Sequence, residues 1–320
     1  MQFASVMAVV EPEGPKDTDS GNHEINDHVI LTALELGKRF QAETVLLHVL
    51  PPNRDVLMMS SQIKQKGAMS AQVSALLQDI NAQTTRRQEY FESLYARHIA
   101  AFEPFLNTDT AATIPGWQPS RFSVRKIMPT GHECREIARL GRLADLIVIA
   151  APQHASGGIE SAALETALLD TGRPVLLAHK RRKALNTQHG GEPVPSPAAG
   201  GRMVIGWDGS RAASLSIRNA LPLLKLAAAV DVVHLATGRE RANPREITDY
   251  LRLHGIKASA HTLSVPDRTV AEVLLGITRS YPSSMLVIGA DSHDVMADAP
   301  FGSVTRDIIN TADVPVFLSH

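Results

Sequence analysis

The sequence predicts an α/β protein of two tandem halves, each built around a five-stranded parallel sheet. Short apolar runs alternate with stretches of helical period, which is typical of repeated βαβ units. The chain of 320 residues is long enough for two domains, because a compact domain usually takes about 100 to 200 residues. The apolar runs at 145–151 and 173–177 also resemble those at 284–290 and 314–318, which indicates a duplication.

The strands are predicted from apolar, β-branched runs, and they follow the same order in both halves. In the first half we expect strands at 6–10, 43–50, 121–127, 144–150 and 174–178, with helices at 27–38, at 133–142 and near Leu164. In the second half we expect strands at 202–207, 230–235, 258–263, 284–288 and 314–318.

Helix signals in the second half are clear. The helix after the first strand has one apolar face, made by Ala213, Ile217, Ala220, Leu221 and Leu224. Asn243, Pro244 and Gly255 suit the N-cap, the first turn and the end of the next helix. Asp267 is predicted to cap a third helix, and a fourth precedes the last strand.

Two segments interrupt the repeated order. In the first half, residues 52–120 separate the second and third strands, a span far beyond an ordinary connection. Apolar residues at helical spacing predict one long or two shorter helices there, which either cover the sheet or form a partner-binding arm. Residues 181–201 are rich in Gly, Pro, Ser and Ala, so we place a linker there, between domains 1–180 and 202–320.

Composition argues against several classes of function. Lys and Arg number 32 against 33 Asp and Glu, so no overall positive field would hold a nucleic acid. The single cysteine, Cys134, excludes an intramolecular disulfide and a cysteine-based zinc site. Neither a secretory signal nor a run of about eighteen apolar residues is present, so a cytoplasmic protein without a membrane span is expected.

The candidate ligand-binding residues follow the first and fourth strands of the second half, where parallel α/β sheets bind their ligands. Asp208 and Gly209 follow the first strand, and Gly289 follows the fourth. The run Gly302-Ser303-Val304-Thr305 then stands at the start of the last helix. Free N–H groups at a helix start attract an anion and two hydroxyls add donors, which predicts a phosphate cradle. The alternative is that Gly302-Ser303 only caps the helix.

These residues resemble the motif of the universal stress protein family. Its nucleotide-binding members carry a glycine, two residues, a second glycine, nine residues, and then Gly-Ser or Gly-Gly followed by Val-Thr. Gly289 matches the first glycine and residues 302–305 match the end, while Ser292 stands in place of the second glycine. Asp208 matches the family's aspartate near the adenosine of ATP, and Leu235 falls where the second strand lines the base.

The resemblance implies a Rossmann-like, adenine nucleotide alpha hydrolase-like fold in each half, with the two halves paired as a pseudo-dimer within the chain. It also implies ATP, bound with Mg²⁺, as the ligand of the second half. The nucleotide-binding residues predicted in this way are Asp208, Gly209, Leu235, Gly289, Ser292, Gly302, Ser303, Val304 and Thr305.

The first half departs from the motif. Glu11-Pro12 replaces the turn after the first strand, Ala150-Ala151 replaces the glycine, and Ala162-Ala163-Leu164 stands where Ser-Val-Thr would open the helix. We therefore expect a degenerate site and a structural role for this half. A Gly-rich run at 156–161 is similar to the pyrophosphate loop of adenylating enzymes, but it follows the fourth strand instead of the first and is predicted to be a surface loop.

The sequence thus predicts a stress-response protein that binds ATP in its second half and acts as a regulator or protective factor. No nucleophile and base are placed for catalysis and no histidine spacing suits a metal, so a binding protein is expected before an enzyme. Two alternatives stay open. One is a slow ATPase or self-phosphorylating protein, in which Ser303 or Thr305 accepts phosphate. The other is a nucleotide-free interaction scaffold, which Ser292 and the insertion favour. By analogy with the family we also expect a homodimer and unidentified protein partners.

Overall fold

The structure is a computed structural model and describes residues 2–12, 21–51, 70–106, 122–152, 161–179, 200–236, 242–264, 267–281, 284–290 and 301–320. The first half contributes β1 (Ser5–Val9), β2 (Glu43–Leu47), β3 (Ser123–Ile127), β4 (Leu146–Ala150) and β5 (Val175–Ala178). The second half contributes β6 (Arg202–Gly206), β7 (Ala229–Leu235), β8 (Ala258–Leu263), β9 (Met285–Gly289) and β10 (Val316–Ser319).

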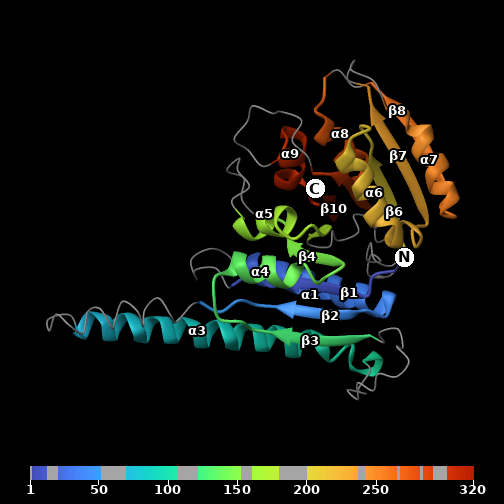
Figure 1. Cartoon of the computed structure of the whole chain (residues 1–320). Coiled ribbons are helices and arrows are strands. Elements are labelled where there is room, and N and C mark those ends of the chain that lie inside the picture. Colours follow the sequence, from blue (N-terminus) through green and yellow to red (C-terminus); the bar gives the residue numbers. More distant parts are fainter. Residues whose placement is uncertain are drawn as a thin grey trace, which may run out of the picture.

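These strands form one sheet in the order β3-β2-β1-β4-β5-β10-β9-β6-β7-β8 (Figure 1). Within each half, neighbouring strands are parallel, and the second half repeats the strand order of the first. The two half-sheets meet at an antiparallel pair, in which Leu176 of β5 lies opposite Phe317 of β10. The predicted α/β class with a mostly parallel sheet is confirmed, and the halves are paired inside one chain.

Helices cover both faces of the sheet, so two hydrophobic layers form. One layer packs under α1 (Gly21–Phe40), α3 (Ser70–Ile99), α6 (Arg211–Leu224) and α7 (Pro244–Leu253). The other packs under α4 (Glu133–Gly141), α5 (Ala162–Leu169), α8 (Val270–Arg279) and α9 (Ser303–Thr311). A short 3-10 helix, Glu103–Phe105, follows α3.

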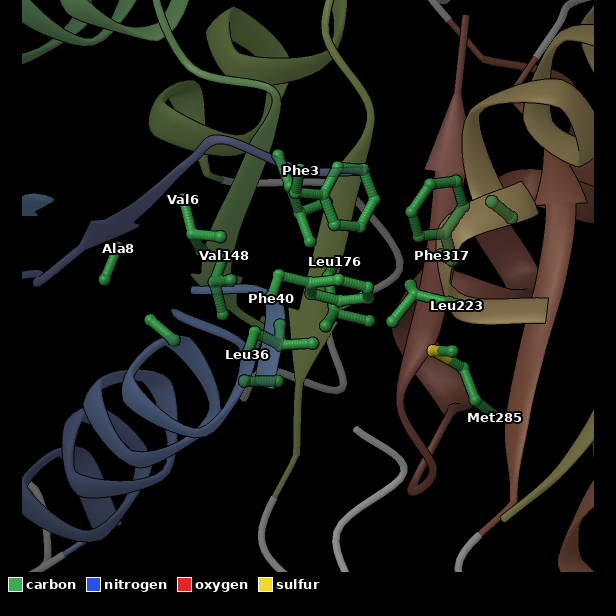
Figure 2. Close-up of a cluster of buried hydrophobic side chains, with 14 of the residues drawn as sticks. Phe3, Val6, Ala8, Leu36, Phe40, Val148, Leu176, Leu223, Met285 and Phe317 are labelled. Atoms are coloured by element: carbon green, nitrogen blue, oxygen red, sulfur yellow. The ribbon is translucent and has the colours of Figure 1, made fainter. Parts of the chain in front are cut away.

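The hydrophobic core is continuous across the β5–β10 pair. In Figure 2, Phe3 and Phe40 lie on the first-half side of Leu176, while Phe317 and Met285 lie on the second-half side. The rings of Phe3 and Phe40 meet edge to face with their centroids 5.1 Å apart, a favourable aromatic geometry. Burial of these large apolar side chains in one cluster therefore stabilises both halves together.

Helix ends explain two of the element boundaries. Asn243 caps α7 by accepting a hydrogen bond from the N–H of Arg245 at 3.0 Å, and Gly255 follows with a φ of +76°, as predicted. The prediction that Asp267 caps α8 is wrong. Thr269 is the N-cap and forms a capping box with Glu272, which satisfies two backbone N–H groups, whereas Asp267 lies two residues too early to do so.

Other boundaries shift by a few residues. The first helix begins at Gly21, six residues before the predicted start at Asp27, and β2 ends at Leu47, three before the predicted end. The strand predicted at 121–127 begins at Ser123, and the last strand begins at Val316 instead of Val314. Such shifts are expected because helix and strand ends have few contacts to fix them.

The described part of the insertion contains the long helix α3, of 30 residues. From Tyr90 onward it packs on the sheet through buried Phe91 and Leu94, and His98 Nε2 lies 2.5 Å from Asp27 Oδ1 of α1. Between Ala75 and Glu89 none of the described side chains is buried, and Figure 1 shows this part of α3 extending beyond the ends of β2 and β3. The helix thus both covers the sheet and projects from it. Almost all of the predicted linker lies outside the described residues, so the boundary between domains 1–180 and 202–320 stays a prediction.

Candidate functional site

Most of the predicted ligand-binding residues lie at the carboxyl edge of the second half-sheet. Strands β9, β6 and β7 are adjacent and parallel, so their carboxyl ends meet at this edge. Gly289 ends β9, Leu235 ends β7, and Asp208 lies two residues beyond the end of β6. The first turn of α9 joins them, because Thr305 Oγ1 lies 3.5 Å from the carbonyl oxygen of Gly289. We call Asp208, Gly209, Leu235, Gly289 and Gly302–Thr305 the second-half edge.

The turn between β6 and α6 is fixed by short-range hydrogen bonds. Asp208 Oδ1 accepts a hydrogen bond from the N–H of Ser210 at 2.9 Å, and Ser210 Oγ caps α6 by accepting from the N–H of Ala213 at 3.0 Å. Gly209 between them has a φ of +77°, a conformation that residues with a β-carbon rarely adopt. Asp208 and Gly209 are exposed, so the turn presents a carboxylate to solvent at this edge.

Gly289 lets α6 approach β9 closely. A β-carbon at this position would lie 2.4 Å from the nitrogen of Ala213 and 2.6 Å from the carbonyl carbon of Ala212. Both are backbone atoms in the first turn of α6, so no side-chain rotation could relieve the contact. Gly289 is therefore required for helix–strand packing, a role that the motif in the sequence did not indicate.

The N-cap residue of α9 supplies no side-chain cap to the helix. Gly302 is the N-cap residue, with φ −62° and ψ 160°, and it makes no side-chain hydrogen bond. Ser303 and Val304 are exposed in the first turn, while Thr305 is only 3% exposed. A helix start of this kind carries partial positive charge and unsatisfied N–H groups, which together favour an anion.

The corresponding helix of the first half is capped. Ser161 precedes α5, and its Oγ accepts a hydrogen bond from the N–H of Leu164 at 3.2 Å. Ala162 and Ala163 then open the helix, as the sequence predicted, and supply no hydroxyl. One N–H group that could meet a phosphate is thus already bonded within the protein.

The carboxyl edge of the first half-sheet is acidic. Burial, together with the charge of Glu133 at the start of α4, raises the pKa of Glu11, which follows β1, to about 7. Burial also raises the pKa of Glu133, although the positive charge of Arg87 on α3 lowers it in part. Asn26 fixes the backbone of Glu11, because its Nδ2 donates to the Glu11 carbonyl at 3.0 Å. Two carboxyl groups at this edge disfavour a phosphate, and the degenerate site of this half stays a prediction.

A histidine at the carboxyl end of the second strand of each half was missed in the sequence: His48 directly follows β2, and His234 is the penultimate residue of β7. His48 Nδ1 lies 2.8 Å from the carbonyl oxygen of Val10, and His234 Nδ1 lies 2.8 Å from that of Trp207. Because a carbonyl oxygen only accepts, Nδ1 carries the proton in both rings and Nε2 is left as an acceptor. Both Nε2 atoms are buried, and neither has a hydrogen-bond partner among the described residues. His48 also stacks on Phe91 of α3 with ring centroids 5.1 Å apart, and burial lowers its pKa.

The whole chain is similar in structure to a universal stress protein from Archaeoglobus fulgidus DSM 4304. The TM-score is 0.55 and the sequence identity 14%, over 98% of this chain and 95% of that chain. The chain has the universal stress protein fold. At this level of identity the likeness concerns the fold alone.

Two further structures with the universal stress protein fold are similar at lower scores. A putative universal stress protein from Pseudomonas aeruginosa UCBPP-PA14 has a TM-score of 0.47 and 15% identity, over 99% of this chain and 93% of that chain. A universal stress protein in complex with cAMP has a TM-score of 0.27 and 11% identity, over 56% of this chain and 99% of that chain. No protein-family model and no curated protein matches the sequence.

Within this universal stress protein fold, eight of the nine predicted residues belong to the second-half edge, and the ninth, Ser292, lies outside the described residues. The Gly-rich run at 156–161 lies outside them too, apart from Ser161. In the described ranges, no three His, Cys, Asp or Glu side chains gather closely enough to hold a metal ion. None of the helices in the described part of the chain has the length and apolar character needed to span a membrane.

Proposed function

We propose that this chain is a cytoplasmic stress-response protein that binds ATP with Mg²⁺ at the second-half edge and acts as a regulator or protective factor. In this proposal the N–H groups of Ser303, Val304 and Thr305 hold the phosphates, and Asp208 lies near the nucleoside. The first half acts as a structural partner, with domains 1–180 and 202–320.

The observation that carries the proposal is the start of α9, where the N-cap residue Gly302 supplies no side-chain cap, at the same sheet edge as the exposed Asp208 turn. Gly302 leaves room for an anion to approach the first-turn N–H groups, because it has no side chain. The first half supplies an internal comparison, since Ser161 caps α5 and Glu11 and Glu133 lie at the same edge. The two halves share one fold, so the difference favours phosphate binding in the second half only.

Thermal stability with and without Mg²⁺-ATP tests the proposal. Ligand at about 100 times its Kd should stabilise the folded protein by about 2.7 kcal/mol, and the melting temperature should rise with concentration and saturate. Gly302→Val should remove this rise, because its side chain would occupy the anion position. Ser161→Ala, at the matching position in the first half, should cost about 1 kcal/mol of stability but leave the ATP-dependent rise intact.

Gly302→Ser separates a lost site from a damaged fold. Serine is a better N-cap than glycine by a few tenths of a kcal/mol, so the free protein should melt slightly higher than the wild type. Its Oγ would accept a hydrogen bond from an N–H group of the first turn, so the rise in melting temperature caused by ATP should shrink.

Trp207, which precedes Asp208, gives a second readout, since Trp117→Phe leaves it as the one tryptophan of the chain. The proposal is wrong if Mg²⁺-ATP changes neither the melting temperature of the wild type nor the Trp207 fluorescence of the Trp117→Phe protein.

The projecting part of α3 favours a second candidate, a nucleotide-free interaction scaffold. The described side chains from Ala75 to Glu89 are not buried, so this part of the helix is accessible to another protein. A scaffold would be stabilised by its partner and not by ATP. For the third alternative, self-phosphorylation, the burial of Thr305 and the exposure of Ser303 favour Ser303 as the acceptor.

A further inference from the structure

The two edges of the ten-stranded sheet differ in chemistry. β3 forms one edge and β8 the other. On β3, Arg125 forms an ion pair with Glu43 at 2.9 Å and Lys126 forms one with Glu92 at 2.5 Å. Charged side chains of this kind protect an edge strand from pairing with another chain. The sequence of β8 is Ala-Ser-Ala-His-Thr-Leu, without lysine, arginine, carboxylate or proline.

The backbone direction of β8 follows from one hydrogen bond. The N–H of Ala236 donates to the carbonyl oxygen of Leu263 at 2.8 Å, so Leu263 turns its backbone groups toward β7. Because the direction alternates along a strand, Ala258, Ala260 and Thr262 turn their N–H and C=O groups away from β7. Residues 259–262 are all exposed, and no described strand pairs with this outer side.

We propose that β8 is a self-association surface, at which β8 of one copy pairs antiparallel with β8 of a second copy across a two-fold axis at Ala260. In this register Ala260 lies opposite its own copy, Ala258 opposite Thr262, and Ser259 opposite His261. Each outward N–H then meets an outward C=O. The facing residues are Ala, Ser, Thr and His, with no lysine, arginine or carboxylate among them, and His261 Nε2 lies 3.2 Å from Asp231 Oδ1 of β7. Neither bulky side chains nor rows of like charge therefore oppose the approach.

Other strands of the sheet are unavailable for such pairing. β5 and β10, which join the two halves, already have neighbours on both sides, and β3 carries its two ion pairs. A pair of six-residue strands is small beside the roughly 1,200 to 2,000 Å² of a stable interface. Association through β8 is therefore weak and depends on protein concentration. It is independent of nucleotide binding.

Sedimentation of the full chain from about 1 μM to about 1 mM covers the range in which a weak interface associates. Ala260→Pro removes the outward N–H of Ala260 but no hydrogen bond to β7, so the fold should persist. The matched control, Ala260→Ser, keeps that N–H. The wild type and Ala260→Ser should form dimers at high concentration. Ala260→Pro should dimerise with a Kd at least about tenfold higher, because each copy loses one hydrogen bond at the two-fold axis.

A cysteine cross-link locates the contact. Opposite residues in a hydrogen-bonded antiparallel pair have Cα atoms about 5.5 Å apart, which suits a disulfide. In a Cys134→Ser background, Ala260→Cys should cross-link under oxidation, and Lys126→Cys on the opposite edge should not. A wild type that stays monomeric over the whole concentration range overturns the proposal. So does a dimer that Ala260→Pro leaves unchanged, since that contact would lie elsewhere on the molecule.

Discussion

At Gly289 the absence of a β-carbon decides how closely a helix can approach a strand. The sequence motif indicates a glycine that faces a ligand, and the structure adds a packing role, because the first turn of α6 lies directly against this residue. A packing requirement applies with or without a bound nucleotide. Loss of ATP binding in a Gly289 variant would therefore not by itself identify a ligand contact.

We predict that Gly289→Ala lowers the free energy of unfolding by about 1 to 3 kcal/mol, the usual cost of overpacking a core. The new β-carbon would meet backbone atoms of Ala212 and Ala213, which have little freedom to move. Gly276→Ala in α8 is the control, because nothing lies within 4 Å of its β-carbon position and alanine favours a helix by about 1 kcal/mol. Urea unfolding of the two variants measures the difference. Equal stabilities would contradict the packing role.

At the scale of the helix, the capping box of α8 makes a separate prediction. Thr269→Ala should cost about 1 kcal/mol, because the side-chain bond to the N–H of Glu272 is lost. Asp267→Ala should change the free energy of unfolding by less than about half of that, because Asp267 is exposed and lies outside the box. Chemical denaturation of both variants decides between the two residues. A larger loss for Asp267→Ala would restore the cap predicted from the sequence.

The elements that sequence patterns predict well are those with a strong local signal. All ten strands lie within or near their predicted ranges. Short, continuous apolar runs such as those of β4 and β9 are typical of strands buried on both faces of a sheet, so their signal is strong. The cap of α8 was misplaced because Asp267 and Thr269 are both good N-cap residues, and only the spacing to Glu272 separates them. The length of α3 was not fixed by the sequence, since spacing alone does not say where a helical insertion breaks.

For the candidate site, the sequence predicted which residues lie at the same edge of the sheet but not the contacts that they make. The order of the strands brings Asp208, Gly289 and Gly302 to one edge, as the βαβ pattern implies. The packing of Gly289 on α6 was not predictable, because it depends on a contact between elements distant in sequence. The two histidines, His48 and His234, had a signal that was overlooked, since each directly follows an apolar run at the end of the second strand of its half.

At the scale of the whole molecule, Glu11 and His179 make the free energy of unfolding depend on pH in opposite directions. The pKa of Glu11 is raised from 4.5 to about 7, so its contribution to stability is complete below pH 4.5 and is lost as the pH rises toward 7. Burial lowers the pKa of His179, which follows β5, from 6.5 to about 4, although the charge of Asp313 opposes this. Its contribution is complete above pH 6.5 and is lost as the pH falls toward 4. Between pH 4.5 and 6.5 the two effects offset each other.

We therefore predict that single substitutions reveal how each of the two groups changes the free energy of unfolding with pH. Glu11→Gln should gain stability relative to the wild type as the pH rises from 4.5 to 7, because the variant has no proton to lose. His179→Gln should gain relative stability as the pH falls from 6.5 to 4, because it has no proton to take up. Urea unfolding at several pH values measures both differences, and each should stay constant outside its own range. A Glu11→Gln difference that does not change with pH would mean that Glu11 titrates normally.

The antiparallel pair of β5 and β10 has a consequence for how the chain could be shortened. All four residues of each strand are buried, and each strand has a neighbour on both sides. A fragment cut between β5 and β6 would expose one of these apolar strands to water as a new sheet edge, open to pairing with any other chain. The first half supplies the strand that covers β10 of the second half, and β10 covers β5 in turn. Trimming this protein to either half would remove that cover, so the two halves are stable as one folding unit rather than as separable modules.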